Sequence, residues 1–322
     1  MISGRVLVTG GAGFIGSHIV DRLLTIPEVE EVIVLDDLST GKLENLSRNL
    51  RNPKLRFVKG DVRSEDLVDS IVRDVNYIFH EAAIVSVELS LRDPVKTNDV
   101  NVGGTINLLS ASLKNEGLER FVYASSCAVY GDPERFPIDE ECKTEPLSPY
   151  GASKVAAEKY IGAFHFTYGL KTVSLRYFNV YGPGQGLTPY SRVISIFLNR
   201  AVKGEPLIIY GDGLQSRDFV YVEDVVDANL LAASKDEAVG KTINIGSGVE
   251  TTIKDLASTV IDLTGRVDLE VIYKPPRRGD IRRSIADIGR AKAILGYEPR
   301  TRLEEGLMKV LRSIQEGTCG EA

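Results

Sequence analysis

Histidine, cysteine and tryptophan are scarce or absent in this sequence, which argues against several kinds of site. The 322 residues include three His, three Cys and no Trp. The cysteines, Cys127, Cys142 and Cys319, are widely spaced, form no metal-binding or redox pattern, and would leave one over from any disulfide. We therefore expect no metal site.

Long apolar runs and dense basic stretches are also missing. No run approaches 18 consecutive apolar residues, and the segment before Val6 is too short for a signal peptide. The net charge is −6, and the one basic cluster is 274–283. We therefore expect a cytoplasmic protein that binds neither nucleic acid nor membranes. A hydrophobic content of 43% suits one large soluble domain or two coupled ones.

The first pattern that is present is a strand, a glycine turn and a helix. Residues 5–9 are typical of a buried parallel strand, and an apolar-periodic helix ends near Leu24. Between them Gly10, Gly13 and Gly16 allow a tight turn and let a pyrophosphate approach the amides at a helix N-terminus. Alone, this spacing also fits a simple tight turn between packed elements.

An acidic residue at the expected distance makes the glycine turn more specific. The second predicted strand, 31–35, ends at Asp36, twenty residues beyond Gly16. A carboxylate there accepts hydrogen bonds from an adenosine ribose and repels a 2′-phosphate. Residues 37–40 supply no arginine for such a phosphate, so we infer NAD rather than NADP. The alternative is that Asp36 only ends a strand.

Strands and helices then alternate, which predicts the α/β class with a Rossmann-type doubly wound parallel sheet. Ligands in such sheets lie beyond the carboxyl ends of the strands. Small residues follow these ends, although each alone also fits ordinary loop packing: Asp61 and Val62, Ala82 and Ala83, Ser125 and Ser126. The further predicted strands are 56–59, 77–80, 120–125 and 171–177, and the predicted helices are 64–73, 93–116 and 149–168.

A tyrosine and a lysine share one face of the predicted helix 149–168. Tyr150 and Lys154 are four residues apart, and Pro149 suits the first turn of a helix. A cation held near a phenol favours the phenolate and lowers the pKa of that phenol. The pair could therefore act as a base, or it could be a chance pair on an ordinary helix.

The composition shifts towards Gly and Pro after residue 178, which predicts a second, smaller mixed α/β domain. We expect a first domain of residues 1–178 plus about 215–246, and a second of 179–214 and 247–322 with helices at 253–264, 287–295 and 303–315. Helices 93–116 and 149–168 carry more apolar residues than one sheet contact needs. They form either a homodimer surface or ordinary core packing.

Taken together, the motifs resemble the extended short-chain dehydrogenase/reductases that act on nucleotide sugars. Within that family the sequence is most similar to the UDP-glucose (UDP-galactose) 4-epimerases, enzymes of galactose metabolism. The resemblance spans nearly the whole chain. It rests on residues 9–16, Asp36, Asp61 and Val62, 125–131, 150–154 and 176–179.

The resemblance implies a reversible hydride cycle. Tyr150 would be the general base at the sugar 4-hydroxyl while hydride leaves C4 for NAD, and Ser126 would hydrogen-bond the same oxygen. Lys154 would hold the nicotinamide ribose and lower the pKa of Tyr150. The 4-keto sugar would rotate before hydride returns. The implied cofactor contacts are Gly10, Gly13, Phe14, Ile15, Gly16, Asp36, Asp37, Ser39, Thr40, Gly41, Asp61, Val62, Ala82, Ala83, Asn101, Ser125, Tyr150, Lys154, Tyr177 and Val180.

The implied substrate is a UDP-sugar. Besides Ser126 and Tyr150, Asn179, Arg217 and Arg277 would contact the sugar diphosphate, and Asp280 would bind the nucleoside ribose. Arg278, next to Arg277, leaves open which of the two is the diphosphate clamp. Surface salt bridging is the alternative role for these arginines.

Two further positions bear on the reaction and its substrate. Related 4,6-dehydratases carry an Asp-Glu pair where this chain has Cys127 and Ala128, so dehydration is disfavoured. Ser284 is the candidate residue that would admit larger N-acetyl sugars. The leading hypothesis is a UDP-hexose 4-epimerase; the alternatives are a 4-epimerase of UDP-N-acetylhexosamines or UDP-uronates, and a non-catalytic NAD-binding protein. The nucleotide base, the sugar range, the oligomeric state and the physiological direction stay open.

Overall fold

A seven-stranded, all-parallel sheet forms the centre of the computed structural model, which describes residues 1–186, 193–276 and 281–316. The strand order is β10-β6-β5-β4-β1-β2-β3, so the chain reverses direction across the sheet between β1 and β4. The predicted doubly wound sheet is confirmed. Its strands are β1 (Gly4–Thr9), β2 (Val29–Asp36), β3 (Leu55–Lys59), β4 (Tyr77–His80), β5 (Arg120–Ser126), β6 (Thr172–Tyr177) and β10 (Thr242–Ile245).

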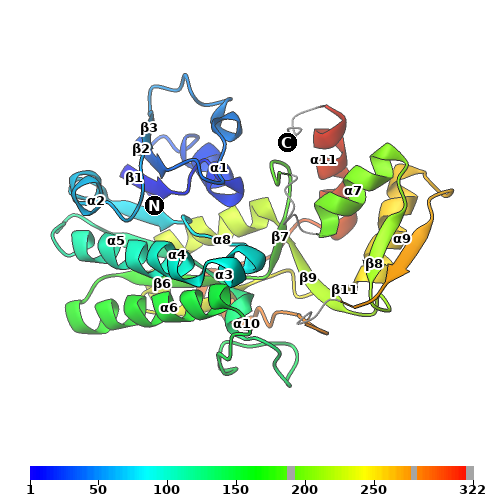
Figure 1. The fold of residues 1–322 in the computed structure, drawn as a ribbon. Helices are drawn as coiled ribbons and strands as arrows, with labels where there is room; N and C mark the ends of the chain where they lie inside the picture. Colours follow the sequence, from blue (N-terminus) through cyan, green and yellow to red (C-terminus); the bar gives the residue numbers. More distant parts are fainter. Residues whose placement is uncertain (187–192, 277–280, 317–322) are drawn as a thin grey trace.

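Helices cover both faces of this sheet (Figure 1). Successive side chains of a strand point to opposite faces. Val6 and Val8 therefore pack in one apolar core, and Leu7 packs in the other. The first core includes residues of α1 (Phe14–Leu23) and α8 (Val222–Ser234), and the second includes residues of α2 (Glu65–Val72), α5 (Gly104–Ser112) and α6 (Pro149–Tyr168).

The single helix predicted over 93–116 is wrong in detail. A separate helix, α3 (Val87–Arg92), comes first, and the Asp93 carboxylate accepts a hydrogen bond from the Lys96 amide to start α4 (Pro94–Asn98). A π-helical turn, Asp99–Gly103, then joins α4 to α5. Such turns are rare and frequently occur at functional sites, and here the turn carries Asn101.

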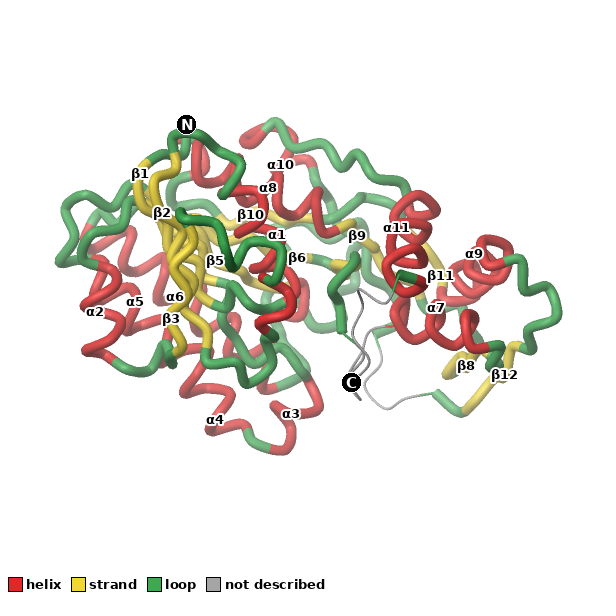
Figure 2. The backbone as a smooth tube through the Cα atoms, turned by 90° about the horizontal axis from the view of Figure 1, so that it is seen from above, coloured by secondary structure: helices red, strands yellow, loops and turns green. Residues whose placement is uncertain are grey.

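Two smaller sheets lie beside the large one (Figure 2). The strand β9 (Ser216–Tyr221) belongs to a three-stranded sheet, whereas the helix after it, α8, returns to the large sheet. The predicted domain division was not tested and stays a prediction. The remaining elements are β7 (Asn179–Tyr181), α7 (Val193–Lys203), β8 (Leu207–Tyr210), β9 (Ser216–Tyr221), β11 (Glu250–Thr252), α9 (Ile253–Thr264), β12 (Val271–Lys274), α10 (Gly289–Leu295) and α11 (Leu303–Gln315).

A fully buried carboxylate on β9 joins three segments of the chain. Asp218 accepts hydrogen bonds from the Ser247 amide and hydroxyl, both at 2.7 Å, from the Gly248 amide at 2.9 Å and from the Ala286 amide at 3.1 Å. Burial raises the pKa of Asp218, and these four hydrogen bonds oppose that rise. Because each bond reaches a loop, Asp218 fixes the backbone at 247–248 and at 286 relative to β9.

Replacing Asp218 with Asn should lower the stability of the fold strongly. The amide cannot accept from all four donors, and its own N–H groups would face donors at short distance, so we expect a loss of about 2–4 kcal/mol. The midpoint of urea unfolding measures this. Asp212→Asn is the matched control, because Asp212 accepts from the Leu214 amide and Arg282 at the surface, and its midpoint should shift much less. Equal shifts would contradict the assigned role of Asp218.

Candidate active site

The predicted glycine turn joins β1 to α1 at the carboxyl edge of the large sheet. Gly10 has φ +67° and lies so close to β4 that an added Cβ would be 2.7 Å from the Ala82 nitrogen. An added Cβ on Gly16 would be 2.3 Å from the Gly10 oxygen. Within the described chain, no side chain caps the start of α1 at Gly13. The helix N-terminus therefore keeps amides for an anion, and Phe14 and Ile15 form its first positions.

Asp36 ends β2 beside this turn and is almost fully buried. Its carboxylate accepts from the Ala12 amide at 3.0 Å and from the Leu38 amide at 2.8 Å. Leu38 has φ +61°, a conformation that is costly for a leucine and that typically marks functional sites. Burial raises the pKa of Asp36, and the two amides oppose that rise. A Cβ on Gly41 would lie 2.8 Å from this carboxylate, so a glycine there leaves it accessible.

The other residues predicted to contact the cofactor near β2 and β3 differ in how exposed they are. Asp61 is partly exposed, and hydrogen bonds from the Arg63 guanidinium are the main reason that the pKa of Asp61 is lowered. Val62 beside it is buried. Three of the predicted residues, Asp37, Ser39 and Thr40, are exposed. A cofactor contact of any of these residues stays a prediction.

Asn101, carried by the π-helical turn, is hydrogen-bonded to the segment that follows β4. Its amide donates to the Ile84 oxygen at 3.0 Å and to the Ser153 hydroxyl at 2.9 Å, and it accepts from the Ile84 amide at 2.7 Å. Ser153 in turn donates to the Tyr150 oxygen. Asn101 thus ties the segment containing Ala82 and Ala83 to the helix that carries Tyr150.

The start of α6 brings Tyr150 close to the end of β5. Ser148 caps the helix by accepting from the Gly151 amide at 3.1 Å, and Pro149 occupies the first turn. A Cβ on Gly151 would lie 2.6 Å from the Ala128 oxygen, so the helix lies directly against the turn after Ser126. The Ser126 hydroxyl accepts from the Ala128 amide at 3.2 Å, which leaves its own hydrogen to donate. Tyr150 is 6% exposed.

Lys154 lies one helical turn beyond Tyr150 and is buried. Its ammonium donates to the Ala124 oxygen at 2.7 Å and lies 4.8 Å from the centre of the Tyr123 ring. Burial lowers the pKa of Lys154 to about 8, against the opposing effect of Glu81 and Glu158. The cation is therefore present at neutral pH and is lost as the pH rises through about 8.

A buried ion pair fixes the next turn of α6 to the sheet. Glu158 accepts from Arg176 on β6 through both oxygens, at 2.9 Å and 2.7 Å, and also accepts from the Ser125 hydroxyl. Arg176 also donates to the Tyr130 hydroxyl at 2.9 Å, which donates to Asn244 on β10 at 2.6 Å. Sequence reasoning missed this network, because the role of Glu158 depends on three other elements.

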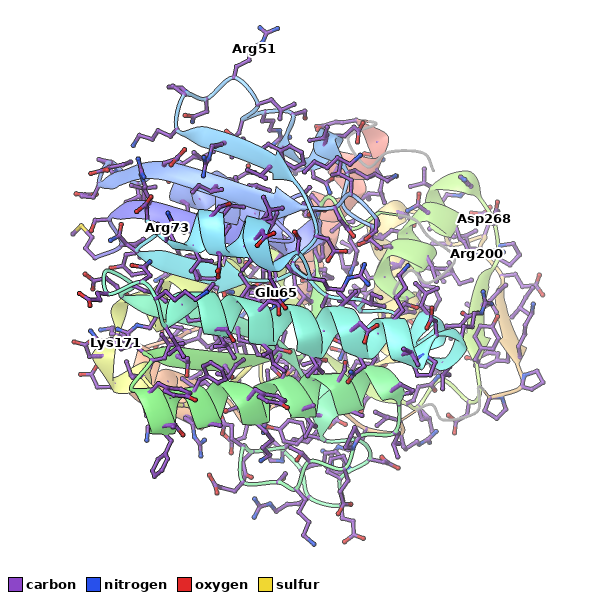
Figure 3. All side chains as sticks on the ribbon, turned by 60° about the vertical axis from the view of Figure 1, so that its left-hand side comes forward. Arg51, Glu65, Arg73, Lys171, Arg200 and Asp268 are labelled. Atoms are coloured by element: carbon purple, nitrogen blue, oxygen red, sulfur yellow. The ribbon has the colours of Figure 1, made fainter. Side chains whose placement is uncertain are left out.

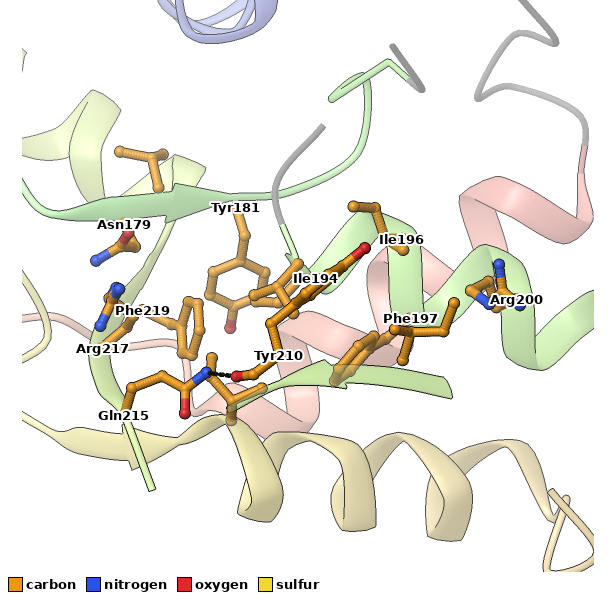
Figure 4. A pocket seen from close by; sticks show the side chains of 14 residues that line it. Asn179, Tyr181, Ile194, Ile196, Phe197, Arg200, Tyr210, Gln215, Arg217 and Phe219 are labelled. Atoms are coloured by element: carbon orange, nitrogen blue, oxygen red, sulfur yellow. Dashed lines mark hydrogen bonds between the residues drawn. The ribbon is translucent and has the colours of Figure 1, made fainter. Parts of the chain in front are cut away.

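A pocket of about 380 Å³ begins two residues beyond β6. Ser126 pairs in register with Tyr177, and Asn179 follows at the pocket wall. Figure 4 shows Asn179 and Arg217 facing one another. The Asn179 side-chain nitrogen is buried and lacks a hydrogen-bond partner in the described structure, so it can donate to a ligand. Val180, predicted to contact the cofactor, also lines this pocket.

Two backbone oxygens hold the Arg217 guanidinium in place. One guanidinium nitrogen donates to the Ser216 and Ile281 oxygens, both at 2.7 Å. Gln215, Arg217 and Phe219 alternate along β9 and therefore share one face. The alternation along 215–219 could have indicated two of the pocket residues missed from the sequence, Gln215 and Phe219. The others missed are Tyr181, Val193, Ile194, Ile196, Phe197, Arg200, Ile208, Tyr210 and Ile253.

The structure describes two of the remaining predicted positions, Ser284 and Cys127. Ser284 is buried, and Cys127 packs against an apolar cluster that includes Tyr130 and Phe178. Arg277 and Asp280, together with Arg278, lie outside the described residues.

Comparison with known proteins agrees with this geometry. Residues 6–246 match the model of the NAD dependent epimerase/dehydratase family. The chain is 40% identical to the UDP-glucose 4-epimerase of Mycolicibacterium smegmatis, over 95% of this chain and 97% of that protein. A structure of the Thermotoga maritima UDP-glucose 4-epimerase with UDP-glucose is 42% identical, with a TM-score of 0.91 over 97% of this chain and 99% of that one.

A relative named for a different sugar is about as similar. The UDP-N-acetylglucosamine 4-epimerase of Methanobrevibacter ruminantium, solved with UDP-N-acetylmuramic acid, is 39% identical. Its TM-score is 0.93 over 98% of this chain and 99% of that one. The resemblance noted in the sequence is thereby confirmed, and so is NAD as the cofactor.

The purified protein should release NAD rather than NADP when it is denatured. A 2′-phosphate would meet the Asp36 carboxylate, so we expect NAD to bind at least about tenfold more tightly, the equivalent of about 1.4 kcal/mol. Titration calorimetry on cofactor-free protein measures both affinities. In Asp36→Asn the preference should shrink, whereas Asp66→Asn, an exposed change on α2, should keep it. Equal affinities in the wild type would contradict the assignment of Asp36.

Proposed function

The chain belongs to the NAD-dependent epimerase/dehydratase family, and from this premise we propose that it interconverts UDP-galactose and UDP-glucose by reversible oxidation at C4 of the sugar. The observation that carries the proposal is a convergence. Ser126, Tyr150 and Lys154 meet at one sheet edge, and a pocket with an unsatisfied amide at Asn179 begins two residues beyond the strand neighbour of Ser126.

The residues around the glycine turn fit NAD. Gly10 and Gly16 have no room for a side chain, α1 lacks a side-chain cap in the described chain, and Asp36 has acceptor capacity left beside the two amides that it binds. When bound, NAD supplies the acceptor and donor of the hydride exchanged with C4. The chain itself supplies the positions and the proton transfers.

Tyr150 acts as the general base in this proposal. It takes the proton of the sugar 4-hydroxyl during oxidation and returns it after the ketone has been reduced. The Ser126 hydroxyl donates to the same oxygen. The Lys154 ammonium, fixed by the Ala124 oxygen, stabilises the phenolate of Tyr150 through its charge.

The turn after Ser126 supports epimerisation over dehydration. Loss of water from a sugar needs an acid and a base beside C5 and C6. Cys127 and Ala128 occupy the positions where the related dehydratases carry such a pair, and an alanine cannot transfer a proton. The acid–base pair for dehydration is therefore incomplete here, whereas Tyr150 and Ser126 can act on the sugar at C4.

The pocket beyond β6 supports a nucleoside diphosphate. Asn179 and Arg217 would bind the diphosphate oxygens, and the apolar residues of α7, β8 and β9 suit a flat base. We carry Arg277 and Asp280 forward as the second diphosphate clamp and the ribose ligand. A second candidate substrate is a UDP-N-acetylhexosamine, favoured by the small side chain of Ser284 and by the 39% identical relative named for such a sugar. A UDP-uronate is a further alternative.

We also propose a homodimer, acting in cytoplasmic galactose metabolism. Figure 3 shows α4, α5 and α6 side by side on one face of the molecule. Large apolar side chains of α4, of α6 and of the neighbouring α3 are exposed: Leu91 at 63%, Val95 at 69%, Tyr160 at 44% and Phe166 at 91%. A second copy would cover them with the same surface about a two-fold axis. No helix of the described residues has the length and apolar character needed to cross a membrane.

Mixing the purified protein with UDP-galactose should yield UDP-glucose without added reductant, because the hydride removed from C4 returns to the same sugar. Chromatography of a panel of UDP-sugars measures this. Conversion of UDP-N-acetylgalactosamine or a UDP-uronate in place of UDP-galactose would select an alternative substrate. No conversion of any sugar would contradict the enzymatic proposal and favour a non-catalytic NAD-binding protein.

The matched variant for this assay is Tyr150→Phe, which removes the base and keeps the ring. Turnover should fall by about 10²-fold or more, and NAD should stay bound. A rate close to that of the wild type would remove Tyr150 from the role of base.

Sedimentation equilibrium should give twice the mass of one chain. Tyr160→Asp places a charge on the exposed face of α6, so this variant should shift the equilibrium towards the monomer. Val267→Asp is the control, since Val267 is 84% exposed beyond α9 and far along the chain from this face. A monomeric wild type would contradict the dimer.

A further inference from the structure

The cation of the candidate active site is buried without an ion pair. Lys154 is 2% exposed, and its ammonium donates to the Ala124 oxygen at 2.7 Å. Among the described residues, Lys154 forms no salt bridge; both oxygens of Glu158, one turn further along α6, are bound by Arg176. A buried charge is costly unless other groups compensate for it. A carbonyl oxygen alone is a small compensation for a full positive charge.

The face of an aromatic ring lies against this ammonium. Tyr123 directly precedes Ala124 on β5, and the Lys154 nitrogen lies over its ring, 4.8 Å from the centre. The face of an aromatic ring carries partial negative charge and attracts a cation, more strongly where water is excluded. Tyr123 is 1% exposed, so this contact is dry. Two adjacent residues of one strand thus hold the ammonium, one through its backbone oxygen and one through its ring.

Neighbouring side chains fix the position of the Tyr123 ring. The His80 ring packs against it at an angle of 40°, with 5.6 Å between the centres. The His80 nitrogens face the hydroxyls of Thr9 and Thr105, at 2.7 Å and 2.9 Å. Burial lowers the pKa of His80 to about 3, so the imidazole is uncharged and does not repel Lys154. The ring is therefore supported from β1, β4 and α5, independently of the lysine.

The Tyr123 hydroxyl makes no hydrogen bond that could explain this arrangement. It is buried and lacks a partner in the described structure, whereas buried hydroxyls are normally bonded. Burial raises the pKa of Tyr123 well above its ordinary value, so the phenol is neutral and forms no ion pair with the ammonium. What Tyr123 offers to Lys154 is the face of its ring. Tyr123→Phe keeps that face and breaks no hydrogen bond of the described residues.

We propose that Tyr123 is a positioning residue, whose ring face holds the Lys154 ammonium one helical turn from Tyr150 and keeps it in the charged form. Lys154 stabilises the Tyr150 phenolate in the proposed reaction, so Tyr123 acts on the base through the lysine and without touching the sugar. This catalytic consequence rests on the proposed function. The contact between the ring and the ammonium does not, because it can be measured without a substrate.

Two carboxylates also favour the charged form of Lys154. Glu81 follows β4 and Glu158 lies on α6, and both oppose the fall in pKa that burial causes, which leaves the pKa of Lys154 at about 8. A substitution confined to the ring at position 123 changes neither carboxylate. A shift in the Lys154 titration that follows such a substitution therefore belongs to the ring.

The sign of the effect follows from the contact. The ring face stabilises the ammonium and not the neutral amine, so weakening the face must lower the pKa of Lys154. The cation is then lost at lower pH. The alkaline limb of catalysis, which follows the loss of the Lys154 proton, must move to lower pH as well.

Fluorinated phenylalanines at position 123 test the ring face at nearly constant shape, because fluorine withdraws charge from the face and adds little volume. Lys154 is titrated by NMR in protein labelled with ¹³C at the lysine ε carbons, with NAD bound, and its signal is assigned by its loss in Lys154→Arg. Tyr123→Phe should keep the midpoint close to that of the wild type. Successive fluorination of this phenylalanine should lower the midpoint stepwise, by roughly half to one pH unit for the fully fluorinated ring.

Phe121 provides the matched control for this series. It lies two residues earlier on β5, is buried in the same apolar core, and packs its ring 6.0 Å from that of His80. The same fluorinated residues at position 121 should leave the Lys154 midpoint unchanged, and thermal melting shows that each variant is folded.

Three results would overturn the proposal. The first is a Lys154 midpoint that stays constant along the series at position 123. The second is a full fall already in Tyr123→Phe, because the hydroxyl and not the ring face would then be responsible. The third is an equal fall in the series at Phe121, because fluorine would then act through the core in general.

The second measurement is the pH dependence of kcat with the UDP-sugar that the panel identifies. Along the series at position 123, the alkaline limb should move by the same amount as the Lys154 midpoint. A limb that stays in place while the midpoint moves would refute the effect of Tyr123 on the base. A chain that turns over no UDP-sugar but shows the stepwise fall would refute the proposed function and leave the contact between ring and ammonium established.

Discussion

The ion pair between Glu158 and Arg176 is the constraint on which the active-site geometry depends. Helix α6 presents Tyr150, Lys154 and Glu158 at intervals of one turn, so the last of these fixes the rotation of the helix for the first two. Arg176 binds both oxygens of Glu158 from β6, and Ser125 binds one of them from β5. The face that carries Tyr150 and Lys154 is thereby held against the strand that ends at Ser126.

Burying this pair is costly, and the protein offsets the cost with hydrogen bonds. An isolated buried charge costs several kcal/mol, and pairing compensates for it only when the remaining hydrogen-bonding groups are satisfied. Here the guanidinium also reaches Tyr130, whose hydroxyl reaches Asn244. Asp218 follows the same rule on β9 with four donors. One buried network thus orients the helix that carries Tyr150, and another fixes the loops at 247–248 and 286 relative to β9.

The sequence predicted those features that local patterns determine. The glycine turn, Asp36 and the Tyr150–Lys154 spacing each lie within one supersecondary unit, and so does α6 from Pro149 to Tyr168. The strands β7, β8, β10, β11 and β12 escaped prediction because three or four residues seldom show a clear period; β4, equally short, was predicted within the alternation of strands and helices. The break in the predicted helix 93–116 depends on Asn101, whose partners Ile84 and Ser153 are distant in sequence.

The same limit applies to the charges around Lys154. A sequence motif predicts the lysine, but burial lowers the pKa of its ammonium, and two carboxylates oppose this effect, one from the end of β4 and one from α6. These two carboxylates are not equivalent. Glu158 is already bound by a guanidinium through both oxygens, so much of its charge is compensated, whereas Glu81 Oε1 lies 2.8 Å from a neutral hydroxyl, that of Tyr177. No motif predicts the position of Glu81, whose contact with Tyr177 forms because β4 and β6 end at the same edge of the sheet.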